Sequence, residues 1–167
     1  RKPHYGTAFA GGRRGEAAAK PELLRIAADG LSPTIVRATA LALLGGYDGA
    51  EVEAAFRSAL LDDEPLLRRT AAAAAAIADP AERAKRLAPL LSDSHRAVRL
   101  EAASQLAGVP ATLLPAYQQE ALATATADYV KAMEHALDFS HGGHNLGLLY
   151  EQQGDSAKAE EAYRRAL

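Results

Sequence analysis

The clearest pattern along the chain is a helical stripe of apolar residues that occurs three times at a constant interval. Three arginines, Arg37, Arg68 and Arg99, are separated by 31 residues each. Apolar residues recur one place before each arginine and three, four and seven places after it, and these positions share one face of an α-helix. The stripe residues are Val36, Ala40, Leu41 and Leu44; Leu67, Ala71, Ala72 and Ala75; and Val98, Ala102, Ala103 and Leu106. We therefore expect three equivalent helices with one face in a core.

A second amphipathic helix is predicted before each of these three, because apolar residues again recur at intervals of three and four. In the middle copy this pattern covers residues 48–61. Asp48 followed by Glu51, and Asp79 followed by Glu82, have the spacing of a capping box. Both aspartates are therefore expected to begin helices.

Prolines and a serine mark the breaks within the predicted helix pairs. Pro33 and Pro65 fit the first turn of a helix, and Ser94 is expected to cap the helix that carries Arg99. Pro89 falls inside the first helix of the third pair. Since proline removes a backbone hydrogen bond, we expect that helix to be kinked or shortened.

The residues after 108 follow a different pattern. A long helix is predicted from Pro115, and a further pair of helices is predicted beyond it. In that pair, Gly147 and Ala159 are small where the two helices are expected to cross closely, and Gly154 with Asp155 is expected to form the turn and cap the second helix. The residues that define the pair are Leu146, Gly147, Tyr150, Gly154, Ala159, Tyr163 and Ala166.

A helix pair of about 30 residues cannot bury both of its faces, so successive pairs are expected to stack. The predicted fold class is all-α, a right-handed α–α superhelix, or α-solenoid. The expected divisions are an N-terminal capping helix or arm at 1–15, three helix pairs at 16–108, a long connecting helix at 109–139 and a last pair at 140–167. The sequence stops within that last pattern, so we expect the chain to be a segment of a longer protein.

The three pairs resemble short HEAT-like repeats of the type found in phycobilin lyase-related proteins. In that pattern an aspartate precedes the arginine by six residues. The matching residues are Asp62 with Arg68 and Asp93 with Arg99. The first pair departs from the pattern, since Asp29 lies eight residues before Arg37, which implies a loop two residues longer.

Residues 140–167 resemble one tetratricopeptide (TPR) repeat, with Gly143 where that pattern often has a large residue. HEAT-like repeats followed by a TPR repeat also resemble the C-terminal region of multihaem c-type cytochrome proteins that carry TPR repeats, whose haem-binding motifs lie upstream. The resemblance implies a haem-free repeat region and export to the periplasm.

Composition narrows the classes of partner. The formal net charge is −2, from 19 basic and 21 acidic residues, so no global field attracts nucleic acid or an acidic membrane surface. The chain has no cysteine, which excludes disulfides, cysteine-ligated zinc and thioether-linked haem within it. We expect a protein or peptide partner, no nucleic acid, no membrane and no cofactor.

The three arginines permit two interpretations. They could line one face and grip a carboxylate-rich partner. Alternatively, each could pair with an aspartate in a neighbouring turn, such as Asp62 or Asp93, and tie one repeat to the next. We favour the second interpretation because the aspartate recurs with the arginine.

A binding surface is expected on the concave side, formed by the second helix of each pair. The predicted contact residues are Arg69, Arg96, Gln105, Asn145 and Gln152. The last helix is expected to expose Ala162, Ala166 and Leu167, so self-association through that end is also predicted.

Other candidate chemistry is sparse. His141 and His144 are three residues apart and could share a metal ion, but Gly142 and Gly143 between them would hold the ligands poorly. The sequence contains neither a nucleophile elbow nor a phosphate-binding glycine loop. We therefore expect a non-catalytic scaffold for protein–protein interaction. The alternative is a lyase-like accessory enzyme that handles a cofactor, which would need a deep pocket with clustered polar groups.

Overall fold

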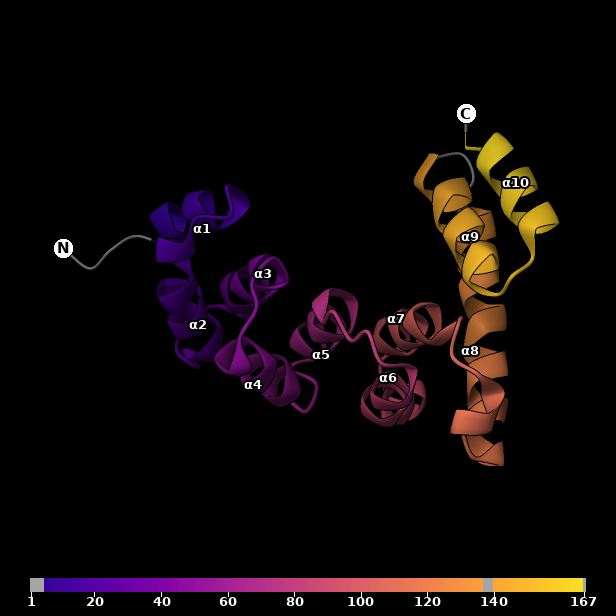
Figure 1. Cartoon of the computed structure of the whole chain (residues 1–167), viewed down its shortest axis with the longest axis horizontal. Helices are drawn as coiled ribbons and strands as arrows, with labels where there is room; N and C mark the ends of the chain where they lie inside the picture. Colours follow the sequence, from indigo (N-terminus) through magenta and orange to yellow (C-terminus); the bar gives the residue numbers. More distant parts are fainter. Residues whose placement is uncertain (1–4, 137–139, 167) are drawn as a thin grey trace. The chain divides into compact units, whose positions relative to one another are not determined.

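The computed structural model describes residues 5–136 and 140–166. Within these residues all regular structure is helical and no β-strand occurs (Figure 1), so the predicted all-α class is confirmed. The α-helices are α1 (Tyr5–Arg13), α2 (Lys20–Ala28), α3 (Thr34–Leu44), α4 (Ala50–Ala59), α5 (Pro65–Ala74), α6 (Pro80–Leu87), α7 (Arg96–Leu106), α8 (Ala116–His135), α9 (Ser140–Gln152) and α10 (Ser156–Arg164). Three short 3₁₀ helices accompany them: η1 (Ala17–Ala19), η2 (Ala88–Ser92) and η3 (Ala111–Leu113).

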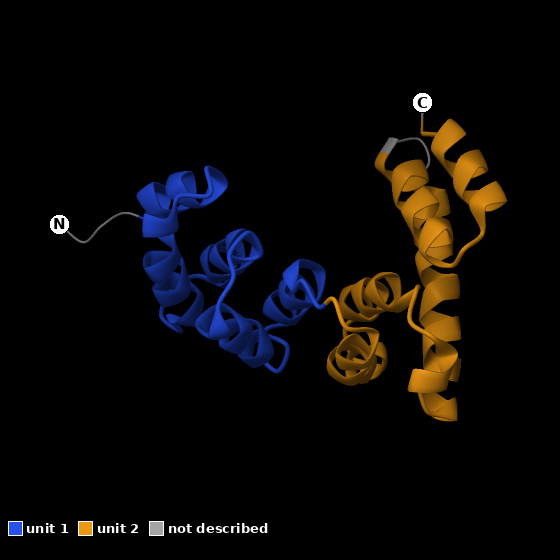
Figure 2. Cartoon of the chain, viewed as in Figure 1, with its two compact units in different colours: residues 1–77 blue, residues 78–167 orange. Residues whose placement is uncertain are grey.

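The chain forms two compact units, residues 1–77 (unit 1) and residues 78–167 (unit 2), which Figure 2 distinguishes by colour. The division falls between the second and third predicted helix pairs, whereas the sequence places its main change at residue 108. The reason lies in α5, which ends at Ala74 because Ala75 takes an extended backbone with φ −70° and ψ 110°. Residues 75–78 are not helical.

Unit 1 is built from two helix pairs and a preceding helix. α2 packs against α3 and α4 against α5, while α3 also packs along α5 and α2 contacts α4. α1 contacts α2 and α3. The largest fully buried side chains of this unit are Leu23, Ile26, Leu41, Leu44 and Leu67. Each contributes about 1.5–3 kcal/mol by its burial.

The predicted apolar stripe is confirmed as core. Ala40, Ala71 and Ala102, three places after the arginines, are each 0% exposed. The residues four places after are also buried. Two members differ: Val36 is half-buried, and Ala75 lies just beyond the end of α5.

The two predicted aspartate caps have different outcomes. Asp79 precedes α6 and its Oδ1 accepts the backbone N–H of Ala81 at 2.9 Å, so this cap is confirmed. Asp48 is wrong as a cap, because α4 begins two residues later and its N-cap is Gly49. Gly49 has φ 129°, a backbone conformation that L side chains rarely adopt, and this glycine therefore sets the start of α4.

The predicted cap at Ser94 is also wrong. The N-cap of α7 is His95, which makes no side-chain cap bond. Its backbone N–H is instead bonded to Oδ1 of Asp93 at 2.8 Å. Asp93 rather than Ser94 accepts this N–H because the aspartate lies two residues before it, which is the geometry of an Asx turn.

Two of the three prolines act as predicted. Pro65 opens α5, whereas Pro33 is the N-cap of α3 and lies one residue before its first turn. α6 ends at Leu87, and Pro89 lies in the following η2, so the first helix of the third pair is shortened. In unit 2, α7 packs against η2, and α8 packs against both α7 and η2. α9 then packs against α8, and α10 packs against α9.

The α9–α10 pair has the close crossing that its small residues predict. A Cβ added at Gly147 would overlap the Tyr163 ring, and Ala159 is 4% exposed. Gly154 has φ 77°, and Oδ1 of Asp155 accepts the backbone N–H of Lys158 at 3.2 Å, which caps α10. Tyr163 also donates its hydroxyl to Glu151 at 2.9 Å.

The prediction that the last helix exposes its alanines is wrong. Ala162 is 4% exposed and Ala166 is half-buried. A Cβ at Gly143 would press on the Ala162 carbonyl and on Ala166, so both residues face α9. Leu167 lies outside the described residues. The exposed positions of α10 are mostly charged.

Candidate functional site

The loops between paired helices share one turn built on an aspartate. In each loop, Oδ1 accepts the backbone N–H two residues later. The bonds are Asp29 with Leu31 at 3.1 Å, Asp62 with Glu64 at 3.0 Å and Asp93 with His95 at 2.8 Å. In the second and third loops, this bond satisfies the N–H of the N-cap residue, Glu64 of α5 or His95 of α7.

Arg68 and Arg99 hold these loops from the following helix in the same way. Nη1 of Arg68 donates to the backbone carbonyls of Asp62 and Asp63 at 2.7 and 2.9 Å. Nη1 of Arg99 donates to the carbonyls of Asp93 and Ser94 at 2.7 and 3.1 Å. The repeated arginine therefore fastens its own loop.

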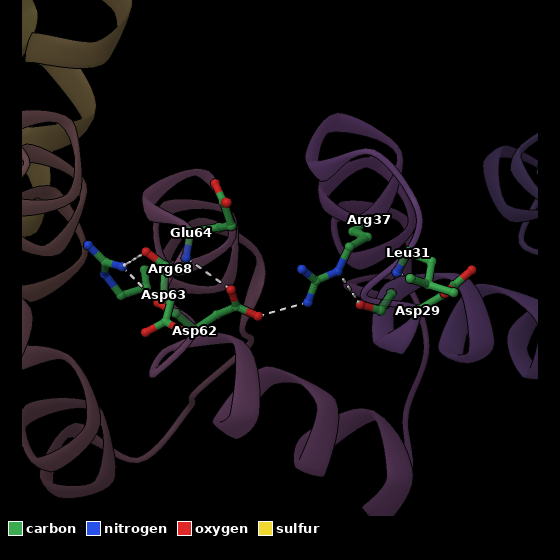
Figure 3. A network of polar contacts seen from close by, with 8 residues as sticks. Asp29, Leu31, Arg37, Asp62, Asp63, Glu64 and Arg68 are labelled. Carbon is green, nitrogen blue, oxygen red and sulfur yellow. Dashed lines mark hydrogen bonds and ion pairs between the residues drawn. The ribbon is translucent and has the colours of Figure 1, made fainter.

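Arg37 makes a different set of bonds, which Figure 3 shows. Its Nε donates to the carbonyl of Ala27 in the last turn of α2 at 3.2 Å, and its Nη2 donates to Oδ2 of Asp62 at 2.8 Å. In the longer first loop, the hydroxyl of Ser32 donates to the second carboxylate oxygen of Asp29 at 2.9 Å. Arg37 thus ties one helix pair to the loop of the next.

A second tie joins the starts of α2 and α4. Nζ of Lys20 donates to the Asp48 carbonyl at 2.7 Å and lies 2.5 Å from a carboxylate oxygen of Glu51. The hydrogen bond from Lys20 to the Glu51 carboxylate lowers the pKa of that carboxyl below its ordinary range. Tyr47 donates its hydroxyl to the Glu16 carbonyl at 2.9 Å. The two helix pairs of unit 1 are therefore fastened at both ends.

Unit 1 contains a cavity of about 160 Å³ beside the Arg37–Asp62 pair. Its wall comes from α2, α3, α4, the loop after α4 and α5. The lining residues are Ala27, Ala28, Arg37, Leu41, Ala55, Ser58, Ala59, Asp62 and Leu67. The cavity thus combines a mostly apolar wall with one ion pair whose side chains are only 15% and 21% exposed.

Three large aliphatic side chains in and beside these loops are exposed to solvent. Leu31, in the loop before α3, is 97% exposed; Leu61, in the loop before α5, is 85% exposed; and Ile35, at the start of α3, is 63% exposed. The apolar pattern does not predict the exposure of these three side chains. The signal in the sequence is weak: Leu31 follows Gly30, and Leu61 ends the helix predicted at 48–61, beside Asp62.

The predicted contact residues lie in both units and differ in their exposure. Arg69 lies exposed on α5 of unit 1, where it takes part in a polar contact. In unit 2, Arg96 of α7 donates to the Asp128 carbonyl of α8 at 3.3 Å, and Gln105 is half-buried and donates to Glu101 at 3.3 Å. This side of α7 packs beside α8, where burial and the Glu101 carboxylate raise the pKa of Tyr129.

The two predicted contact residues on α9 also differ from each other. Asn145, expected to be exposed, is half-buried, and its Nδ2 lies 3.7 Å from the sulfur of Met133 on α8. Gln152 is exposed at the end of α9. A Cβ at Gly108 would lie 3.2 Å from the Gln152 carbonyl, so the end of α9 lies against the turn that follows α7.

The histidine pair does not assemble a metal site in the described residues, where no group of three or more histidine, aspartate or glutamate side chains is placed to hold an ion. His141 and His144 are both exposed. The His144 ring lies 5.9 Å from the Tyr163 ring and packs against it at a tilt. Among the described helices, none is long and apolar enough to cross a membrane.

Comparisons with known proteins give no relative. No family model matches the chain, and neither a curated protein nor a solved structure matches it.

Proposed function

We propose that this chain is a non-catalytic scaffold that binds another protein. The observation that carries the proposal is the exposure of Leu31 and Leu61, on loops whose backbone is held by hydrogen bonds, and of Ile35 at the start of α3. Apolar surface gains about 25 cal/mol per Å² when a partner covers it. Because the loops are already ordered, binding would cost little conformational entropy.

Packing inside unit 1 supports the repeat architecture. The first helices α2 and α4 contact each other, and the second helices α3 and α5 pack together, as in stacked helix pairs. Since the 31-residue interval continues to Arg99, we propose a right-handed solenoid of three HEAT-like pairs followed by the TPR-like pair α9–α10. The same order of repeats supports the proposal that the chain is the haem-free arm of a larger, multihaem cytochrome-like protein. Cys-x-x-Cys-His motifs upstream in the full-length sequence would be expected, and their absence would contradict that affiliation.

The accessory-enzyme alternative is supported less well. The cavity of unit 1 does hold the polar side chains of Arg37, Ser58 and Asp62. At about 160 Å³ it is close to the volume of roughly 150 Å³ that holds a benzene molecule in an engineered protein cavity. A linear tetrapyrrole is several times larger, so this cavity suits one side chain better than a whole cofactor.

The scaffold proposal is tested by affinity capture with the purified chain. Wild type, a Leu31→Ser/Leu61→Ser double variant and a Leu113→Ser control are immobilised and exposed to an extract of the source organism. Leu113 is an exposed leucine of unit 2, 42% exposed, and so controls for the loss of any surface leucine. We expect at least one protein that wild type and the control retain and the double variant loses. Capture that is the same for all three, or no capture at all, would contradict the proposal.

A further inference from the structure

The cavity of unit 1 has the size of one large apolar side chain. Its volume of about 160 Å³ is that of the engineered cavity that takes up benzene. Four alanines, Ala27, Ala28, Ala55 and Ala59, form much of its wall. Ala28 and the neighbouring lining residue Ser58 are exposed, so the cavity is open to solvent between α2 and α4.

A hydrogen-bond donor stands in the wall of this cavity. A guanidinium has five N–H donors, and Arg37 gives one to the Ala27 carbonyl and one to Asp62 (Figure 3). Further donors of Arg37 are therefore available to a carbonyl oxygen of an occupant. Because Asp62 neutralises Arg37, a neutral acceptor such as a peptide carbonyl suits the site better than an anion.

The loops beside the cavity carry an excess of negative charge. Four carboxylates, those of Asp29, Asp62, Asp63 and Glu64, lie in these two loops. Arg68 donates to two backbone carbonyls of the second loop, and Arg37 neutralises Asp62. Asp63 and Glu64 are exposed. Lysine or arginine in an occupant would complement them.

The fold of the loop does not require its leucines. The third loop forms the same Asx turn on Asp93 and the same arginine bonds. At the position of Leu61 it has Ser92, and at the position of Leu31 it has His95. Since the turn forms without a large aliphatic residue there, the exposed leucines of unit 1 point to a partner.

We propose that the edge of unit 1 formed by Leu31, Leu61 and the cavity binds a basic segment of a partner protein. One side chain of the size of leucine or phenylalanine enters the cavity, its peptide carbonyl accepts from Arg37, and flanking lysine or arginine residues lie beside Asp63 and Glu64. This proposal rests on the scaffold function and names the chemistry of its partner.

The test measures binding of a fluorescent peptide to the whole chain by fluorescence anisotropy. The peptide has one central leucine, two lysines on each side of it and glycine at both ends. Ala55→Leu fills the cavity, and the double variant Asp63→Lys/Glu64→Lys reverses the exposed charge. We expect each change to weaken binding about tenfold or more, as does replacement of the central leucine of the peptide by alanine. Rising salt should weaken the peptide's binding to wild type more than to the charge-reversed variant.

Matched controls lie on α8, where Ala123 and Glu120 are exposed. Ala123→Leu and Glu120→Lys add the same kinds of group at residues of unit 2 that do not line the cavity, and should leave the affinity within about twofold. Circular dichroism checks that each variant is folded. Unchanged binding to Ala55→Leu, equal binding of the alanine peptide, or an equal loss with Glu120→Lys would overturn the proposal.

Two further outcomes identify other occupants and also overturn it. If N-acetyl-leucinamide competes as strongly as the peptide, the cavity takes a small molecule. If sedimentation shows a dimer that Leu31→Ser/Leu61→Ser dissociates, the edge joins two copies of this chain. Failure of the scaffold function is distinct, since then the affinity capture described above retains no partner, whereas a captured partner that Ala55→Leu still binds refutes only the cavity.

Discussion

Asp62 is the residue on which the loop between α4 and α5 depends most. One carboxylate oxygen accepts the Glu64 N–H and the other accepts from Arg37, so a single side chain both forms its turn and joins two helix pairs. Both partners of the ion pair are mostly buried, which makes the loss of either one costly.

We expect Asp62→Ala to lower the free energy of unfolding by about 2 kcal/mol, because it removes the acceptor of Arg37 Nη2 and of the Glu64 N–H. Urea unfolding followed by circular dichroism measures this. Asp63→Ala is the matched control, since that residue is exposed and contributes its backbone carbonyl to Arg68. It should change stability by less than about 0.5 kcal/mol. Equal losses in the two variants would show that the ion pair does not stabilise the loop.

Gly147 is a second position where one atom decides the packing. Alanine in place of a helical glycine favours the helix by about 1 kcal/mol. Here the added Cβ would overlap the Tyr163 ring, and such overpacking costs about 1–3 kcal/mol. We therefore expect Gly147→Ala to destabilise α9–α10, measured as a lower thermal midpoint, and Tyr163→Ala in the same chain to relieve most of the added loss. Gly46→Ala, where the nearest atom is 3.7 Å away, serves as the control; a midpoint lowered as much there would mean that the effect is not steric.

At the scale of helices, local pattern predicts the core faces but not every boundary. The stripe residues around Arg68 and Arg99 are predictable because neighbours on one helix face are fixed by sequence spacing alone. The caps are less so: Asp48 and Asp79 have the same spacing to a glutamate, yet only Asp79 caps, since Gly49 takes a positive φ and begins α4 later. Exposure of Leu31 and Leu61 could not be predicted, because it depends on which helices cover a loop and a leucine in a turn normally indicates core.

The paired aspartates therefore give a sharp prediction. Asp79→Ala should destabilise the chain by about 1 kcal/mol, since it removes the acceptor for the Ala81 N–H. Asp48→Ala should have almost no effect, because Lys20 donates to the Asp48 carbonyl, which alanine retains. Thermal unfolding of the two variants distinguishes them. If Asp48→Ala costs as much as Asp79→Ala, the start of α4 is assigned wrongly.

We expect the stability of the chain to fall at alkaline pH when Tyr129 of α8, beside α7, ionises. Burial and the Glu101 carboxylate raise the pKa of this phenol above its ordinary value of 10.0. The folded state therefore disfavours the phenolate, and the stability contributed by the neutral phenol is present below pH 10.0 and lost as pH rises through the raised pKa. We expect Tyr129→Phe to lose less stability than wild type between about pH 9 and pH 12 in thermal unfolding. Parallel pH profiles for the two proteins would show that Tyr129 ionises freely.

At the scale of the whole molecule, each unit has a core of its own. Leu23, Ile26 and Leu41 are buried among helices that contact one another within unit 1. In unit 2, Leu87, Val98 and Leu106 lie on helices of the continuous series in which α6 contacts α7, α7 contacts α8, and α9 contacts α8 and α10. The sequence change at residue 108 is therefore not a break in packing, because α8 contacts α7 before it and α9 after it.

From these separate cores we expect residues 1–77 and residues 78–167, produced as two fragments, each to be helical and to unfold cooperatively. Fragments of this size bury enough apolar surface to fold alone, though with low stability. The sum of their circular dichroism spectra should match that of the whole chain. Asp62→Ala should then lower the thermal midpoint of the first fragment, and Gly147→Ala that of the second. A fragment that gives a coil spectrum would mean that its buried leucines need the rest of the chain, and the division at Ile77 would not mark an independent folding unit.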